Sequence, residues 1–144
     1  GLNIGKIDIG RNRLNFWDLG GQKELQKIWK KYYTECHSIV FVVDSTDRER
    51  IEEVRLAFEN VITNDSVEGV PVLMLANKQD IEGSLKVHDI KEIFNPIAVK
   101  LGARDSKVMP VSALRGESVK EAVEWLQIRM ERNSGNRPPV YRSS

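Results

Sequence analysis

Apolar residues along this chain follow two main patterns, short unbroken runs and stripes spaced three or four residues apart. The runs occupy residues 38–43, 72–76 and 108–111. Unbroken apolarity predicts strands that are covered on both faces, as in a parallel sheet. The stripes predict helices, and they occupy residues 24–33, 51–62, 90–101 and 119–130. Alternating strands and helices predict an α/β domain whose ligand binds beyond the carboxyl ends of the strands.

The N-terminal part of the chain has a third pattern, which predicts a β-hairpin. Apolar and polar residues interleave from Leu2 to Ile9, and the turn residues Gly10-Arg11-Asn12 follow. A second extended segment then leads into Trp17 and Asp18. The hairpin therefore feeds directly into the loop that begins at Asp18.

Two details concern the helices. Thr46, with Glu49 three residues later, predicts a capping box before the helix over residues 51–62. Asn95-Pro96 predicts either a kink in the helix over residues 90–101 or its division, because proline has no amide hydrogen to donate.

Length and composition set the scale of the protein. With 144 residues and 40% hydrophobic content, the chain has the length of one domain, which we expect to span residues 1–133. Residues 134–144 are predicted to form a disordered tail. The net charge of +1 gives no basic field for nucleic acid. The single cysteine, Cys36, forms no internal disulfide, which fits a reducing, cytoplasmic compartment.

The first candidate site follows the hairpin, where an acid ends a strand and two glycines and a glutamine come next: Asp18, Gly20, Gly21 and Gln22. A carboxylate at a strand end can hold Mg²⁺ through water, and a glycine N–H can approach a terminal phosphate oxygen. A glutamine amide can orient an attacking water. The segment therefore predicts a phosphate sensor, and the alternative is an ordinary turn between a strand and a helix.

The second candidate site is Asn77-Lys78-Gln79-Asp80, which follows the apolar run over residues 72–76. The Asp80 carboxylate can accept two hydrogen bonds from the ring N–H and the exocyclic amine of guanine, a donor pair that adenine lacks. Asn77 would tie the loop and reach the imidazole edge of the base, while the Lys78 stem would lie over the ring plane. The alternative is a polar turn with an exposed lysine.

The third candidate site is Ser112-Ala113, at the end of the apolar run over residues 108–111. The Ala113 backbone N–H could donate to the guanine carbonyl oxygen, and Ser112 could brace the loop. Because all three segments follow predicted strands, we expect them to converge at one edge of the sheet.

The three segments together resemble the third, fourth and fifth guanine-nucleotide motifs of the small GTPases. The form Trp17-Asp18-Leu19-Gly20-Gly21-Gln22 is similar to that of the Arf branch, and residues 1–5 and 31–37 resemble its Golgi-associated, Arf-related members. This resemblance implies a switch that binds and hydrolyses GTP with Mg²⁺ and is GDP-bound after hydrolysis. Gln22 would position the hydrolytic water, Gly21 would sense the γ-phosphate, and Asp18 would reach Mg²⁺ through water.

The resemblance also implies partners and a location. An effector surface would include Trp17 and Tyr32, with Leu2 where the family usually has phenylalanine. Through this surface an exchange factor, a GTPase-activating protein and Golgi effectors would bind. We expect a cytoplasmic protein that associates peripherally with trans-Golgi membranes and regulates vesicle trafficking.

The phosphate-cradling motif Gly-x-x-x-x-Gly-Lys-Ser/Thr does not occur among the 144 residues. The expected fold is therefore a P-loop NTPase-like, mostly parallel sheet with flanking helices that lacks the first strand, the P-loop and the first helix. We expect a fragment, a truncated isoform or the product of an incomplete gene model. The alternative function is a nucleotide-free interaction module or non-functional truncation, and an unrelated α/β nucleotide enzyme is a third hypothesis.

Overall fold

The computed structural model describes residues 3–9, 12–18, 29–78, 81–100, 106–110 and 116–139. Contacts within the chain divide it into two compact units, Gly1–Cys36 and His37–Ser144. Each unit has a sheet of its own.

The first unit contains the predicted hairpin. Strands β1 (Asn3–Ile9) and β2 (Asn12–Asp18) pair antiparallel, with Asn3 opposite Asp18 and Ile9 opposite Asn12. Near the turn, Asp8 lies directly opposite Arg13, and the Arg13 Nε donates to Asp8 Oδ1 over 2.7 Å. Opposite charges at facing positions support this register. Of the helix predicted over residues 24–33, residues 29–32 form a short 3-10 turn, while residues 24–28 lie outside the described residues.

The second unit contains a parallel sheet of three strands in the order β3-β4-β5. The strands are β3 (Ile39–Asp44), β4 (Val72–Asn77) and β5 (Ser106–Pro110). The register places Ile39 beside Val72 and Val72 beside Ser106, so the three strands begin at the same edge of the sheet. The unbroken apolar runs therefore form the predicted parallel strands.

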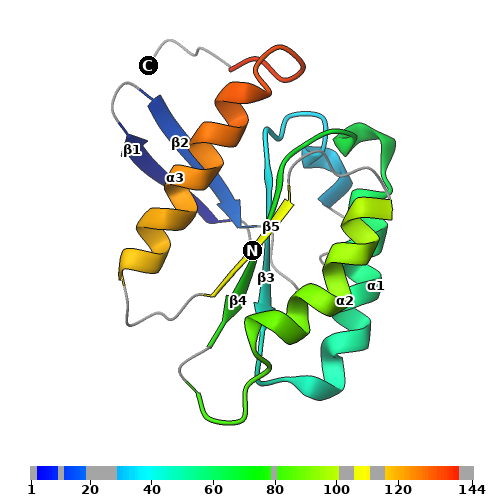
Figure 1. Ribbon diagram of the computed structural model, residues 1–144. Coiled ribbons are helices and arrows are strands. Elements are labelled where there is room, and N and C mark those ends of the chain that lie inside the picture. Colours follow the sequence, from blue (N-terminus) through cyan, green and yellow to red (C-terminus); the bar gives the residue numbers. More distant parts are fainter. Residues whose placement is uncertain are drawn as a thin grey trace. The chain divides into compact units, whose positions relative to one another are not determined.

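Both faces of this sheet are covered by helices. Figure 1 shows α1 (Ile51–Ile62) and α2 (Val87–Lys100) beside each other on one face, and α3 (Gly116–Arg132) on the other. Consecutive residues of β4 point to opposite faces, yet Val72, Leu73 and Met74 are all at most 3% exposed. The apolar run in β4 is therefore unbroken because both faces of this strand are buried, as the sequence pattern predicts.

An aromatic cluster joins the sheet to the two helices on the first face. Phe58 of α1 contacts Phe41 of β3 with the ring centroids 5.5 Å apart, and it contacts Phe94 of α2 over 5.3 Å. Both pairs are edge-to-face, the arrangement that the charge distribution of aromatic rings favours. Phe58 and Phe94 are at most 2% exposed, so Phe58 lies at the centre of this side of the core.

Strand β3 differs from β4 because it has a strand partner on one side only among the described residues. Val42, in the middle of its apolar run, is 58% exposed. The pattern of β3 is that of a central strand, whereas within the described sheet of the second unit β3 pairs with β4 alone.

The start of helix α1 departs from the prediction. The predicted capping box is wrong: a 3-10 turn over Arg48–Arg50 precedes α1, and neither helix start has a side-chain cap. The Thr46 hydroxyl donates to Asp44 instead, over 2.6 Å. Helix α2 continues through Pro96, so the proline does not divide it. No helix in the described ranges is long and apolar enough to cross a membrane.

Residues after α3 make specific contacts with earlier residues of the second unit. The Arg137 guanidinium donates to the Ser66 carbonyl oxygen, and Asn133 Nδ2 donates to the Gly69 carbonyl oxygen over 3.4 Å. His37 Nε2 lies 3.0 Å from the Pro138 carbonyl oxygen. Within the predicted tail, residues 134–136 form turns and Arg137 and Pro138 make these contacts, while residues 140–144 lie outside the described residues.

Replacing Phe58 tests the aromatic cluster. We expect Phe58→Ala to lower the free energy of unfolding by about 3–5 kcal/mol, because it removes a buried ring between two others. Leu56→Ala on the same helix is the matched control, since Leu56 is 50% exposed and its loss should cost well under about 1 kcal/mol. Urea unfolding followed by circular dichroism measures both, and equal losses would contradict this account of the core.

Candidate functional site

The carboxyl ends of the three parallel strands lie at one edge of the sheet. Asp44, the last residue of β3, is beside Asn77, the last residue of β4, and Ala76 is beside Pro110, the last residue of β5. The loops that follow β3 and β4 therefore begin next to each other. This is the edge at which open α/β sheets bind their ligands.

Lys78, directly after β4, has an unusual backbone conformation. Its φ is 60°, and it is the one residue other than glycine with a positive φ in the described ranges. The left-handed conformation is unfavourable for a side chain with a Cβ atom. The Asn77 side chain supports it, because Asn77 Oδ1 accepts a hydrogen bond from the Lys78 backbone N–H over 2.9 Å. Strain of this kind concentrates at functional sites.

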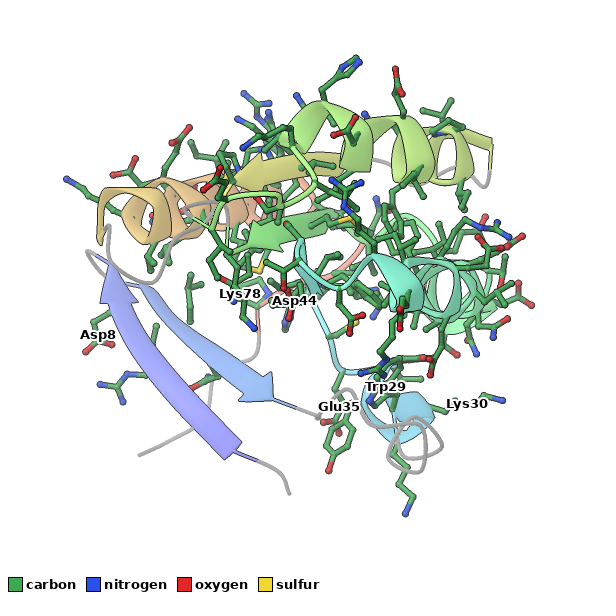
Figure 2. The ribbon with its side chains drawn as sticks, turned by 90° about the horizontal axis from the view of Figure 1, so that it is seen from below. Asp8, Trp29, Lys30, Glu35, Asp44 and Lys78 are labelled. Carbon is green, nitrogen blue, oxygen red and sulfur yellow. The ribbon has the colours of Figure 1, made fainter. Side chains whose placement is uncertain are left out.

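The Lys78 side chain is anchored on the neighbouring strand. Lys78 Nζ donates to Asp44 Oδ2 over 2.8 Å, and Figure 2 shows the two labelled side chains beside each other. The hydrogen bond from Lys78, followed by those from the Thr46 side chain and backbone, lowers the pKa of Asp44 from 3.8 to about 2. The same hydrogen bond raises the pKa of Lys78 above 10.5. The pair is therefore charged throughout the physiological pH range.

Backbone hydrogen bonds attach both sides of the loop after β4 to the segment after β3. The Ser45 N–H donates to the Asn77 carbonyl oxygen over 3.2 Å, and the Leu85 N–H donates to the Ser45 carbonyl oxygen over 2.8 Å. Arg48 adds a hydrogen bond from its guanidinium to the Gly83 carbonyl oxygen over 3.0 Å. Ser45 is fully buried, so these bonds are shielded from water.

A cavity of roughly 200 Å³ lies elsewhere, at the amino ends of β3 and β4. Its walls include Ile39, Ile62, Asn64 and Val72. It contains none of the predicted site residues, so the candidate site is the loop after β4 and not this cavity.

Of the predicted site residues, the structure describes the side chains of Asn77, Lys78 and Tyr32. Asn77 ends β4 and accepts a hydrogen bond from the Lys78 backbone N–H, and Tyr32 is half-buried in the 3-10 turn of the first unit. Trp17 and Asp18 end β2, and only their backbone is described. The remaining residues lie outside the described residues: Leu2, Gly20, Gly21, Gln22, Asp80, Ser112 and Ala113. Convergence of the three segments stays a prediction.

Sequence reasoning missed Asp44 as a member of the site. The available signal was its position, since Asp44 ends an apolar strand just as Asp18 does. The residue types around it gave a different interpretation, because Thr46 and Glu49 match a capping box. The parallel register beside Asn77 is what brings Asp44 to Lys78, and local sequence does not contain that information.

Comparison of the fold with solved structures places the protein in the small GTPase class. A solved structure of the Arl6 BBS3 small GTPase from Trypanosoma brucei, with the bound nucleotide analogue GppNp, superposes with a TM-score of 0.81 and 28% sequence identity. The match covers 92% of this chain and 80% of that one. The predicted fold class is confirmed.

Sequence comparison gives the family within this class. The profile of the ADP-ribosylation factor family matches residues 1–130. ADP-ribosylation factor-like protein 3 of Saccharomyces cerevisiae is 50% identical over 143 residues, which are 99% of this chain and 72% of the yeast protein. Human ADP-ribosylation factor-related protein 1 is 52% identical over 142 residues, covering 99% and 70% respectively. The chain therefore belongs to the ADP-ribosylation factor family of small GTPases, as the three motifs predicted.

The ion pair between Asp44 and Lys78 predicts that the free energy of unfolding falls at both low and high pH. The lowered pKa of Asp44 gives stabilisation that is present above pH 3.8 and is lost as the pH falls through about 2. The raised pKa of Lys78 gives stabilisation that is present below pH 10.5 and is lost as the pH rises through the higher folded value. Both side chains are more than a third exposed, so water screens the pair and its contribution to the free energy of unfolding is small.

An NMR titration of the Asp44 carboxyl group checks this account. Lys78→Met should raise the pKa of Asp44 from about 2 toward 3.8, because the largest cause of the shift is removed. Arg55→Gln breaks a comparable ion pair with Glu52 on α1 and should leave the Asp44 titration unchanged. An unchanged pKa of Asp44 in Lys78→Met would show that the pair does not form in solution.

Proposed function

We propose that this protein is a GTP-binding switch that reads the guanine base with the loop after β4. The observation that carries the proposal is the state of Lys78: its backbone is left-handed, Asn77 supports it, and Asp44 fixes its amine at the ligand edge of the sheet. A simple solvent-exposed turn needs none of these three features. Membership of a family of small GTPases supports the same conclusion.

Base recognition would be divided among three residues of this loop. The Asp80 carboxylate would accept hydrogen bonds from the ring N–H and the amine of guanine. Asn77 would reach the imidazole edge of the base and already ties the loop through its hydrogen bond to Lys78. The aliphatic stem of Lys78 would cover the ring plane, an arrangement that fits an ammonium group held back on Asp44.

The remaining site residues would act on the other parts of the nucleotide. Ala113 would donate its backbone N–H to the guanine carbonyl oxygen, with Ser112 bracing the loop, and Gly20 and Gly21 would approach the γ-phosphate. Asp18 would hold Mg²⁺ through water, and the ion would supply charge neutralisation to the phosphates when bound. Gln22 would orient the water that attacks the γ-phosphate. The reaction is GTP plus water to GDP plus phosphate.

The switch would act on trafficking at trans-Golgi membranes. The relatives carry the names ADP-ribosylation factor-like and ADP-ribosylation factor-related protein, which supports an Arf-related role. Leu2, Trp17 and Tyr32 would form the surface for effectors, an exchange factor and a GTPase-activating protein. Ordering of this segment by the γ-phosphate would change which partners bind, and association with the membrane would be peripheral.

A second candidate function is a nucleotide-free interaction module. It is favoured by the sequence of the 144 residues, which contain no Gly-x-x-x-x-Gly-Lys-Ser/Thr motif. Such a module would keep the surface around Trp17 and Tyr32 without switching it. The two candidates differ in whether guanine nucleotide binds at all.

Nucleotide titration separates the two candidates. We expect the protein to bind fluorescent mant-GDP with Mg²⁺, and excess GDP but not ADP to displace it. Asp80→Asn should lower the affinity about a hundredfold, because the charge is removed and the amide, with one acceptor oxygen, turns a donor toward the second N–H of guanine. Glu82→Gln removes an exposed acid two residues away and should bind as the wild type does. Absence of guanine-specific binding in the wild type would contradict the GTP-binding switch and favour the nucleotide-free interaction module.

The role of Gln22 is tested by single-turnover phosphate release. We expect Gln22→Ala to slow GTP hydrolysis about a hundredfold, because the attacking water is no longer oriented. The affinity for GTP should stay within about twofold, since Gln22 does not touch the base. Gln127→Ala on α3 is the matched control. A loss of GTP affinity that equals the loss of rate would contradict a role in positioning the water.

A further inference from the structure

We propose that Asp44, held by Thr46, is a positioning residue for Lys78 and thereby sets the affinity and the residence time of the guanine nucleotide. Asp44 does not touch the ligand in this role. It fixes the amine of Lys78 so that the stem of that side chain is already placed when the base arrives. The inference rests on the proposed function of the loop after β4, and it adds a residue of β3 to that site.

The Asp44 carboxylate divides its two oxygens between two tasks. Oδ1 accepts hydrogen bonds from the Thr46 hydroxyl over 2.6 Å and from the Thr46 backbone N–H over 2.9 Å. Oδ2 accepts the hydrogen bond from Lys78 Nζ over 2.8 Å. The first oxygen therefore fixes the carboxylate, and the second offers a fixed anchor to the lysine. An acid that only balanced charge would need no such brace.

Lys78 is a residue that needs an anchor. Its side chain has four carbon atoms before the amine and is 48% exposed, so in isolation it would sample many rotamers. Its left-handed backbone also directs the side chain differently from that of an ordinary strand residue. With the backbone supported by Asn77 and the amine held by Asp44, both ends of the side chain are fixed.

The anchor and the loop belong to one connected piece of structure. Ser45, next to Asp44, is bonded through its backbone to Asn77 on one side of the loop and to Leu85 on the other. Arg48 adds a bond to Gly83. Asp44 therefore keeps a constant position relative to the loop that carries Lys78. The Lys78 side chain is therefore already in place before a ligand binds, and it loses less conformational freedom on binding.

If Asp44 acted only through its charge, replacing it would have the opposite effect on nucleotide affinity. Asp44 is an anion near a site for an anionic nucleotide, so removing its charge should strengthen binding if charge alone mattered. Asp47 provides the control for this effect, because its charge also raises the pKa of Lys78 and acts on the amine through space. The positioning role predicts that Asp44 and Asp47 behave differently when neutralised.

A double-mutant cycle on the full chain tests the proposal, with mant-GDP as the probe. The four proteins are the wild type, Asp44→Asn, Lys78→Met and the combination, with Asp47→Asn as the charge-matched control. We expect Asp44→Asn to weaken binding and to speed dissociation about fivefold in the wild-type background, and to have no further effect when Lys78 is already methionine. Asp47→Asn should bind as tightly as the wild type or slightly more tightly.

The outcomes separate this inference from the function on which it rests. Wild-type binding with no effect of Asp44→Asn would overturn the positioning role alone. The same would follow if Asp44→Asn weakened binding equally with and without Lys78, because Asp44 would then act by another route. Urea unfolding of each variant shows whether a loss reflects a damaged fold, and Asp44→Glu should restore part of the affinity. No guanine binding by the wild type would overturn both proposals.

Discussion

The parallel pairing of β4 between β3 and β5 is the constraint on which the second unit depends. Because β4 is bonded on both sides and covered on both faces, Leu73 is fully buried and the strand has no freedom to shift its register. That register places Asp44 beside Asn77 and Ala76 beside Pro110. The positions of the loops at the ligand edge follow from strand pairing in the core.

The segment after β3 links this core to the chemistry of the site. Its backbone, through buried Ser45, holds the loop after β4, and the acid that precedes it holds the amine of Lys78. The individual hydrogen bonds are ordinary in length, and the exposed ion pair contributes little to global stability. Their effect is local, since they hold one lysine in an unfavourable backbone conformation at the place where a base would bind. Stability of the core and order of the site thus have different sources.

Local sequence predicts the elements well and their ends less well. The apolar runs correspond to β3, β4 and β5, and three of the four stripes correspond to α1, α2 and α3, because burial on one or two faces imposes a period that is visible in sequence. Pro96 predicts a bend or a division of α2, and the helix continues through it. Thr46 fits the pattern of a capping box, although a nearby carboxylate binds its hydroxyl. Such competition between partners is decided by geometry and not by residue type.

The sequence by itself determined the family and the loop at Asn77 and Lys78, because motifs with fixed residue types and spacing survive without any coordinates. Only the tertiary structure decided that Asp44 contacts Lys78. Asp44 and Lys78 are 34 positions apart, and parallel strands bring them within 2.8 Å. The structure also decided that β3, whose sequence is that of a central strand, has a strand partner on one side only in the described part of the chain. Pairing between distant segments carries this information, and no local pattern records it.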